Sequence, residues 1–153
     1  MKICIASSAG GHFIQALKIV DFLKGENFEY FFITHFAEHI DQNISKNKKL
    51  YFITDPRRNF LKFFKSLIQS FAVLKKERPD VVISTGAGTA VPICYLAKFL
   101  LRSKIIHIDS FSRVYKPALV SKILYPISDL FFVQWGNMKQ KYGAKAIYGG
   151  SLL

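Results

Sequence analysis

Acidic residues are scarce in this chain. Its 153 residues include ten Asp and Glu against 22 Lys and Arg, which gives a formal net charge of +12. A surplus of this size creates a positive potential over much of a small domain. The expected partners therefore carry phosphate, as a nucleic acid, an anionic lipid or a pyrophosphate-bearing substrate does.

Cysteine is also rare. Cys4 and Cys94 lie inside apolar runs and lack the CxxC spacing of zinc and redox sites. They are typical of small buried side chains in a reducing compartment, which argues against a disulfide framework. No DxD-type metal motif is present in the sequence. We therefore expect neither a metal nor a cofactor in this chain.

Long hydrophobic runs are missing as well. The sequence has no uninterrupted stretch of about 20 apolar residues, so no membrane-spanning helix is expected. Its N-terminal apolar run is too short for the core of a signal peptide. The sequence therefore predicts a cytoplasmic protein that touches the cytoplasmic face of the plasma membrane only peripherally.

Strand-like apolar runs alternate with helical patterns along the whole chain. The candidate strands are Lys2–Ala6, Tyr30–Thr34, Leu50–Ile53, Val81–Ser84, Lys104–Ile108 and Leu130–Val133. Helical spacing occurs near residues 12–24, 36–46, 57–77, 89–102 and 115–125. This alternation predicts one α/β domain over residues 1–153, Rossmann-like, with a parallel sheet and helices on both faces.

Ligands of open parallel sheets bind beyond the carboxyl ends of the strands, and the loop after the first candidate strand has suitable residues. Gly10 and Gly11 permit a tight turn, and the helix that follows would direct its amide groups at an anion. His12 at the start of this helix could act as a general base, or it could simply cap or pack locally. We predict that Ser8, Gly10 and Gly11 bind the ligand and that His12 is catalytic. The fingerprints GxGxxG and GxxxxGK[ST] are absent, which argues against dinucleotide binding and ATP hydrolysis.

A second glycine-containing loop follows the fourth candidate strand. Its residues Thr85, Gly86, Gly88 and Thr89 would admit a phosphate or a sugar between a strand end and a helix N-terminus. A single GxG is a weak signal, and a close strand-to-helix turn explains it equally well.

The third loop follows the fifth candidate strand. Asp109 could orient a sugar hydroxyl or a catalytic histidine, and we predict it to be catalytic. Ser110 and Arg113 would bind the acceptor or its phosphate, since a guanidinium pairs well with phosphate. The alternative is that Asp109 or Ser110 only caps the following turn.

The segment 57–78 combines a broad apolar arc with almost exclusively positive charges. This pattern fits a core helix with a solvated basic face, but it also fits a helix lying in the headgroups of an anionic membrane. We favour membrane contact. The residues predicted to make it are Arg57, Arg58, Phe60, Lys62, Phe63, Phe64, Lys65, Leu67 and Phe71.

Four motifs in order resemble one protein family. They are SSAGGH at 7–12, STGAG at 84–88, HIDSFSRV at 107–114 and FVQW at 132–135. They resemble the oligosaccharide-biosynthesis family of bacterial PssD/CpsF-type capsule proteins. That family includes the membrane-recruiting subunit of the eukaryotic enzyme that adds the second N-acetylglucosamine to dolichol-linked sugar.

The resemblance implies the N-terminal, acceptor-side half of a GT-B glycosyltransferase. A partner chain would bind the UDP-sugar, and this chain would hold a polyprenyl-pyrophosphate-linked acceptor in capsular or exopolysaccharide synthesis. Transfer would invert the anomeric carbon, with His12 as the base. The family often has Glu where this sequence has Asp109, which weakens a direct role for that carboxylate.

Two other functions fit the same sequence. The chain could be a non-catalytic adaptor that recruits its partner glycosyltransferase to the membrane. A basic nucleic-acid-binding domain is suggested only by the charge, because the basic residues of 57–78 alternate with bulky apolar ones and match no RNA- or DNA-binding signature.

Overall fold

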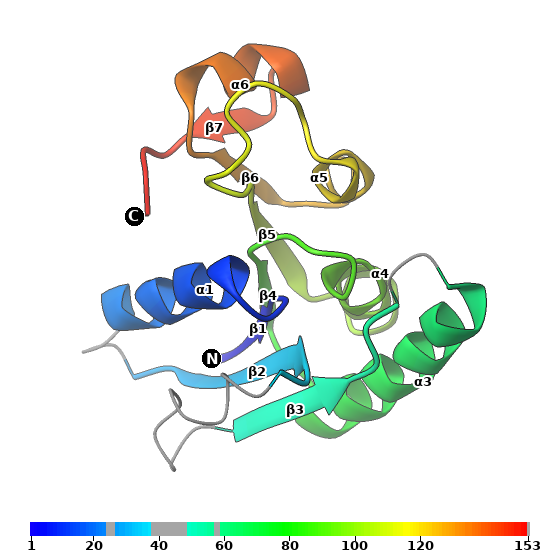
Figure 1. Cartoon of the computed structure of the whole chain (residues 1–153). Coiled ribbons are helices and arrows are strands. Elements are labelled where there is room, and N and C mark those ends of the chain that lie inside the picture. Colours follow the sequence, from blue (N-terminus) through cyan, green and yellow to red (C-terminus); the bar gives the residue numbers. More distant parts are fainter. Residues whose placement is uncertain (24–26, 38–48, 57–58, 153) are drawn as a thin grey trace.

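A computed structural model describes residues 1–23, 27–37, 49–56 and 59–152 (Figure 1). The described strands form one seven-stranded parallel sheet in the order β3-β2-β1-β4-β5-β6-β7. The strands are β1 (Lys2–Ala6), β2 (Glu29–His35), β3 (Lys49–Ile53), β4 (Val81–Ser84), β5 (Lys104–Ile108), β6 (Leu130–Val133) and β7 (Ala146–Tyr148). The order reverses between β1 and β4, which makes this pair the topological switch point of the sheet.

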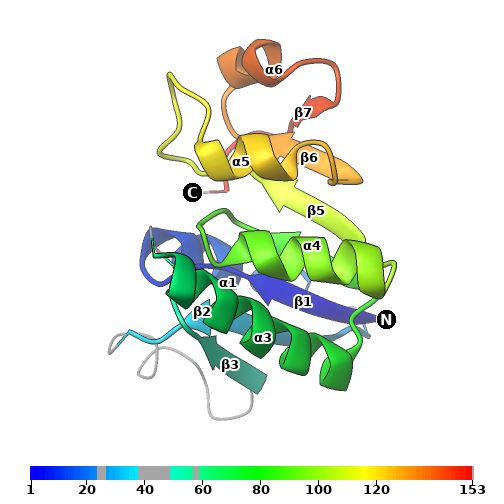
Figure 2. The ribbon, with the colours of Figure 1, turned by 90° about the vertical axis from the view of Figure 1, so that its right-hand side faces the viewer.

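Helices cover both faces of the sheet. They are α1 (Gly11–Phe22), α3 (Phe60–Glu77), α4 (Ala90–Leu100), α5 (Leu119–Leu124) and α6 (Gly136–Tyr142). The helices α3, α4 and α5 lie side by side on one face (Figure 2), and α1 lies on the other (Figure 1). None of the described helices is long and apolar enough to cross a membrane.

Two apolar cores fill the space between sheet and helices. Neighbouring residues of one strand point to opposite faces, so Cys4 and Phe31 pack toward α4 while Ile5 and Phe32 pack toward α1. Strands that are buried on both faces need apolar residues at nearly every position, which is why they appear as short apolar runs in the sequence.

The structure confirms the predicted fold class and most of the predicted elements. Four of the six predicted strands, β1, β4, β5 and β6, have the predicted bounds, and the other two are longer by one or two residues. The prediction for 115–125 was wrong at its start, because the chain stays irregular until Leu119. The prediction missed α6 and β7, and the helix predicted at 36–46 lies mostly outside the described residues.

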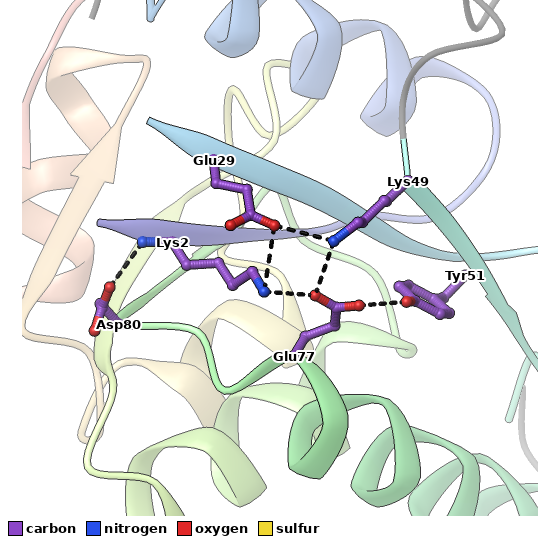
Figure 3. A network of polar contacts seen from close by, with 6 residues as sticks. All are labelled: Lys2, Glu29, Lys49, Tyr51, Glu77 and Asp80. Carbon is purple, nitrogen blue, oxygen red and sulfur yellow. Dashed lines mark hydrogen bonds and ion pairs between the residues drawn. The ribbon is translucent and has the colours of Figure 1, made fainter. Parts of the chain in front are cut away.

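An ion-pair network closes the amino edge of the sheet (Figure 3). We call it the amino-edge network; its members are Lys2, Glu29, Lys49, Tyr51, Glu77 and Asp80. Glu77 at the end of α3 lies 2.7 Å from Lys2 Nζ and 3.6 Å from Lys49 Nζ, and it also accepts a hydrogen bond from the Tyr51 hydroxyl. The bond from Lys2, followed by the one from Tyr51, lowers the pKa of Glu77 to about 2.

Candidate functional site

The site lies at the switch point, where the loops after β1, β4 and β5 meet. Gly10 precedes α1 with a φ of +83°, a conformation that glycine adopts without strain. His12 therefore stands in the first turn of α1. Its Nδ1 lies 2.6 Å from the carbonyl oxygen of Thr85, and the Thr85 hydroxyl donates to the His12 carbonyl at 3.0 Å. These two bonds fix the start of α1 to the loop after β4.

The Thr85 contact defines which nitrogen of His12 is free. A carbonyl oxygen only accepts hydrogen bonds, so Nδ1 must carry the proton and Nε2 keeps a lone pair. Burial lowers the pKa of His12, and the positive charge of Arg113 lowers it further, against the opposing effect of the Thr85 bond. The imidazole is therefore neutral at neutral pH. A neutral imidazole with a free nitrogen can accept a proton.

Gly86 makes room for the histidine ring. Its φ is +96°, and a Cβ at this position would lie 3.1 Å from Cε1 of His12. Any side chain here would strain the backbone and push the ring away from Thr85. A Cβ at Gly88 would meet only ordinary contact, 3.7 Å from Pro56. The two glycines that were predicted together thus have different roles.

His12 lines two cavities. One, of about 190 Å³, is lined by His12, Gly86, Ser110 and Arg113 together with residues 118–121. The other, of about 370 Å³, includes Gly11, His12, Ser110 and Phe111. We call His12, Gly86, Ser110 and Arg113 the His12 site. It brings together one predicted residue from each of the first two loops and two from the third.

The other predicted binding residues lie behind these cavities or beside them. Thr85 and Thr89 are buried, and the Thr89 hydroxyl donates to the Ser7 carbonyl at 3.3 Å, so both threonines join one loop to another. Ser8 is half-buried, and Gly10 is exposed at the turn. A ligand-binding role for Ser8, Gly10, Thr85, Gly88 and Thr89 stays a prediction.

Asp109 ends a buried chain of hydrogen bonds. Its Oδ1 accepts from the Ser121 hydroxyl at 2.6 Å, and Ser121 Oγ lies 2.9 Å from Nε2 of His107. His107 Nδ1 lies 3.2 Å from the Ser84 hydroxyl, which accepts from the Gly86 amide at 3.2 Å. All donors and acceptors match if His107 is neutral with its proton on Nε2.

The pKa shifts of His107 and Asp109 agree with this pattern of hydrogen bonds. Burial lowers the pKa of His107 to about 3, which keeps the ring neutral. Burial also raises the pKa of Asp109, while the bond from Ser121 opposes the rise. Asp109 is only 1% exposed, and its hydrogen bond from Ser121 joins the end of β5 to α5. A catalytic role for Asp109 stays a prediction.

Side chains from the segment 134–137, which joins the end of β6 to the first turn of α6, hold the loop 109–118 in place. Gln134 Nε2 donates to the Asp109 carbonyl at 2.8 Å, and Trp135 Nε1 donates to the Phe111 carbonyl at 2.7 Å. Asn137 donates to the Val114 carbonyl at 2.7 Å. These contacts give the FVQW motif a structural role that the sequence did not reveal. A polar Gln134 next to an apolar strand was the available signal.

Helix α3 is turned with its apolar side outward. Leu61 is 80% exposed and Ile68 is 68% exposed, whereas Ser66 and Ser70 are buried. Their hydroxyls find no hydrogen-bond partner among the described residues. A core helix would show the opposite arrangement. We call the outward residues the α3 face; they are Phe60, Leu61, Phe64, Ile68 and Phe71.

The predicted membrane residues follow this orientation in part. Lys62 and Lys65 are exposed beside the α3 face, and Phe63 and Leu67 are half-buried at its border. Arg57 and Arg58 lie outside the described residues. Membrane contact itself stays a prediction at this point.

One protein family and several individual proteins match this chain in sequence. The profile of one family, described as "Oligosaccharide biosynthesis protein Alg14 like", matches residues 54–152. A Candida albicans protein named "UDP-N-acetylglucosamine transferase subunit ALG14" is 39% identical over 89 residues, which are 55% of this chain and 41% of that protein. The human protein of the same name is 37% identical over 93 residues, 58% of this chain and 43% of that protein. The matches thus span about two fifths of the length of these relatives.

Solved structures match over almost the whole chain. MurG from Acinetobacter baumannii superimposes with a TM-score of 0.79 at 16% identity, covering 99% of this chain and 45% of MurG. A UDP-N-acetylglucosamine 2-epimerase from Rickettsia bellii gives 0.76 at 15% identity, with coverage of 99% and 45%. Identities this low show the fold alone, and they confirm the predicted Rossmann-like half of a GT-B architecture.

Proposed function

We propose a function from one premise: the chain belongs to the Alg14-like family of oligosaccharide biosynthesis proteins. In this proposal the chain is the acceptor-side subunit of a two-chain inverting glycosyltransferase. It holds a polyprenyl-pyrophosphate-linked sugar, and a partner chain brings UDP-N-acetylglucosamine, the donor named in its relatives. Bacterial capsular or exopolysaccharide assembly is the setting that we propose.

The free Nε2 of His12 carries this proposal. In the reaction, Nε2 takes the proton from an acceptor hydroxyl as its oxygen attacks the anomeric carbon of the donor sugar. The bond from that carbon to the UDP oxygen breaks, and the configuration inverts. A neutral imidazole beside two cavities has the protonation state and the access that this step needs. His12 is thus the group that touches the reacting atoms.

Charge at the same place supports binding of the acceptor's pyrophosphate. Arg113 is exposed at the rim of the smaller cavity. The first turn of α1, which is the positive end of the helix dipole, lies at the same cavity, so both features attract an anion there. In this proposal Asp109 acts as a positioning residue, because its carboxylate is buried and holds Ser121.

The α3 face supports a peripheral site on the membrane. It exposes five large apolar side chains, with Lys62 and Lys65 beside them. Helix α3 also begins at the carboxyl edge of the sheet, the edge on which the His12 site opens (Figure 1). A lipid carrier could therefore stay in the bilayer while its sugar reaches His12.

Co-expression with a glycosyltransferase-like partner tests the proposal. Each chain alone and both together would be assayed on membranes with radiolabelled UDP-N-acetylglucosamine. We expect transfer only with both chains. Full transfer by the partner alone would contradict a catalytic subunit and leave the membrane adaptor, the second candidate, which the α3 face supports independently of His12.

A further inference from the structure

We propose that a groove between the C-terminal halves of α3 and α4 binds one molecule of an anionic phospholipid. The apolar part of the groove would hold part of an acyl chain, and Arg78 and Arg102 would hold the phosphate. This inference deepens the proposed function, since it rests on the contact of α3 with a bilayer.

The groove consists of two adjoining hollows. The apolar hollow, of about 200 Å³, is lined mainly by Phe71, Leu74, Leu96, Leu100 and Leu101. The second, of about 490 Å³, opens at the ends of both helices. Arg78, Leu100 and Leu101 line both hollows, so the two adjoin. We call the pair the α3–α4 groove.

The second hollow is cationic. Arg78 follows the C-terminal end of α3 and Arg102 that of α4, both line the hollow, and Lys75 lines the apolar part. Within the described chain, neither arginine forms an ion pair with an acidic side chain. The one carboxylate in the hollow, Asp80, accepts from the Lys2 amide at 2.7 Å. Two free guanidinium groups beside an apolar hollow match a phosphate with a hydrocarbon tail.

The backbone gives a second, independent reason. Arg78 has a φ of +46° and Arg102 a φ of +57°, the left-handed conformation in which glycine is favoured at helix ends. The attraction of a cation to a helix C-terminus accounts for a positive charge at each position. It does not account for two strained arginines that line the same hollow.

Continuity with the α3 face selects a bilayer lipid as the occupant. Phe71 belongs both to the α3 face and to the groove, and the exposed Leu100 extends the apolar surface onto α4. Both helices lie on the same face of the molecule (Figure 2). A bilayer that met the α3 face would therefore meet the opening of the groove.

A soluble, monomeric lipid tests the groove without a membrane. The full chain would be titrated by calorimetry with dihexanoyl phosphatidylglycerol below its micellar concentration. Dihexanoyl phosphatidylcholine and glycerol 3-phosphate would serve as ligands that lack the net charge or the tails. We expect saturable one-to-one binding of phosphatidylglycerol alone. Equal binding of either comparison ligand would overturn the proposal.

The variant R78G/R102G separates binding from folding. Glycine fits the left-handed positions, so we expect the free energy of unfolding of R78G/R102G to be unchanged or higher than that of the wild type. Loss of two charged contacts to phosphate should weaken binding about tenfold or more. The control K122Q/K139Q removes two exposed lysines outside the groove and should keep the wild-type affinity. Equal affinities of the two variants would overturn the assignment.

Vesicle flotation keeps the two proposals apart. Flotation with phosphatidylglycerol vesicles measures the membrane contact of the α3 face, which L61S/I68S should abolish while monomer binding persists. Wild-type flotation without monomer binding would end the groove proposal and leave the membrane contact intact. Monomer binding without flotation would support the groove and end the membrane contact.

Discussion

In the amino-edge network opposite charges meet and neutralise one another, whereas at the His12 site on the carboxyl edge a positive charge stays unpaired. Glu77 has Lys2, Lys49 and Tyr51 around it. Arg113, in contrast, is exposed at a cavity and forms no ion pair within the described chain. The amino-edge network uses charge for stability, and the His12 site keeps the charge of Arg113 available for a ligand.

The backbone shows the same contrast. None of the six residues of the amino-edge network has a positive φ. At the carboxyl edge Gly10, Gly86 and Ala87 all have positive φ, and Ala87 at +85° is strained because it carries a Cβ. Strain of this kind often accompanies functional sites. Substitutions at the two edges should therefore affect different measurements.

The largest expected effect comes from His12→Ala. Removing a general base typically lowers turnover by about 10²–10⁴-fold, so kcat of the two-chain complex should fall in this range. The free energy of unfolding should fall by only about 1 kcal/mol, since the ring is half-buried and one hydrogen bond to Thr85 is lost. The matched control is Lys18→Ala, later in α1, which should keep normal turnover. A normal kcat for His12→Ala would show that His12 is not the catalytic base.

Glu77→Gln should lower the free energy of unfolding and leave kcat unchanged, the reverse of what we expect for His12→Ala. It removes a carboxylate that is 4% exposed and leaves Lys2 without its 2.7 Å partner. The lysines reach water, so we expect a loss of about 2 kcal/mol in the free energy of unfolding, below the value for a fully buried pair. Urea denaturation measures it, and kcat should not change.

Glu29→Gln serves as the control for this substitution. Glu29 contacts the same two lysines, but its side chain is 56% exposed, so the loss should be smaller. Equal losses at the two positions would mean that burial does not decide the strength of the network.

Gly86→Ala tests the geometry around His12. The new Cβ would lie 3.1 Å from the histidine ring, in a conformation that costs about 1–2 kcal/mol for a residue with a side chain. We expect that loss in stability together with a fall in kcat as the ring moves. Gly88→Ala meets only a 3.7 Å contact and should be tolerated. Equal effects of the two alanines on kcat would show that ring placement is not critical.

The contrast between the edges was only half visible in the sequence. Apolar runs predicted the strands, because burial on both faces demands them. The glycine pairs and His12 predicted where the site lies, because a parallel sheet brings strand ends together. The amino-edge network was not predictable in this way, since Lys2, Glu29, Lys49 and Glu77 are far apart in sequence and form no local pattern.

The missed elements have a related cause. β7 has three residues and α6 seven, too few to show a period. The irregular path of 109–118 depends on bonds from Gln134, Trp135 and Asn137, which come from a distant part of the chain. Sequence patterns report local preference, and these contacts are non-local.

The smallest expected effect is a shift in pH dependence. Nε2 of His12 accepts a proton only when the ring is neutral, so activity should rise with pH through the pKa of His12. Burial and the charge of Arg113 place that pKa below its ordinary value of 6.5. Arg113→Gln removes the positive charge, so the pKa should rise and the acid limb of kcat/KM should move to higher pH. Arg113→Lys keeps the charge and should keep the limb, even if both variants raise KM by weakening phosphate binding. An acid limb that does not move in Arg113→Gln would mean that His12 and Arg113 are not coupled, and the carboxyl edge would then owe its reactivity to burial alone.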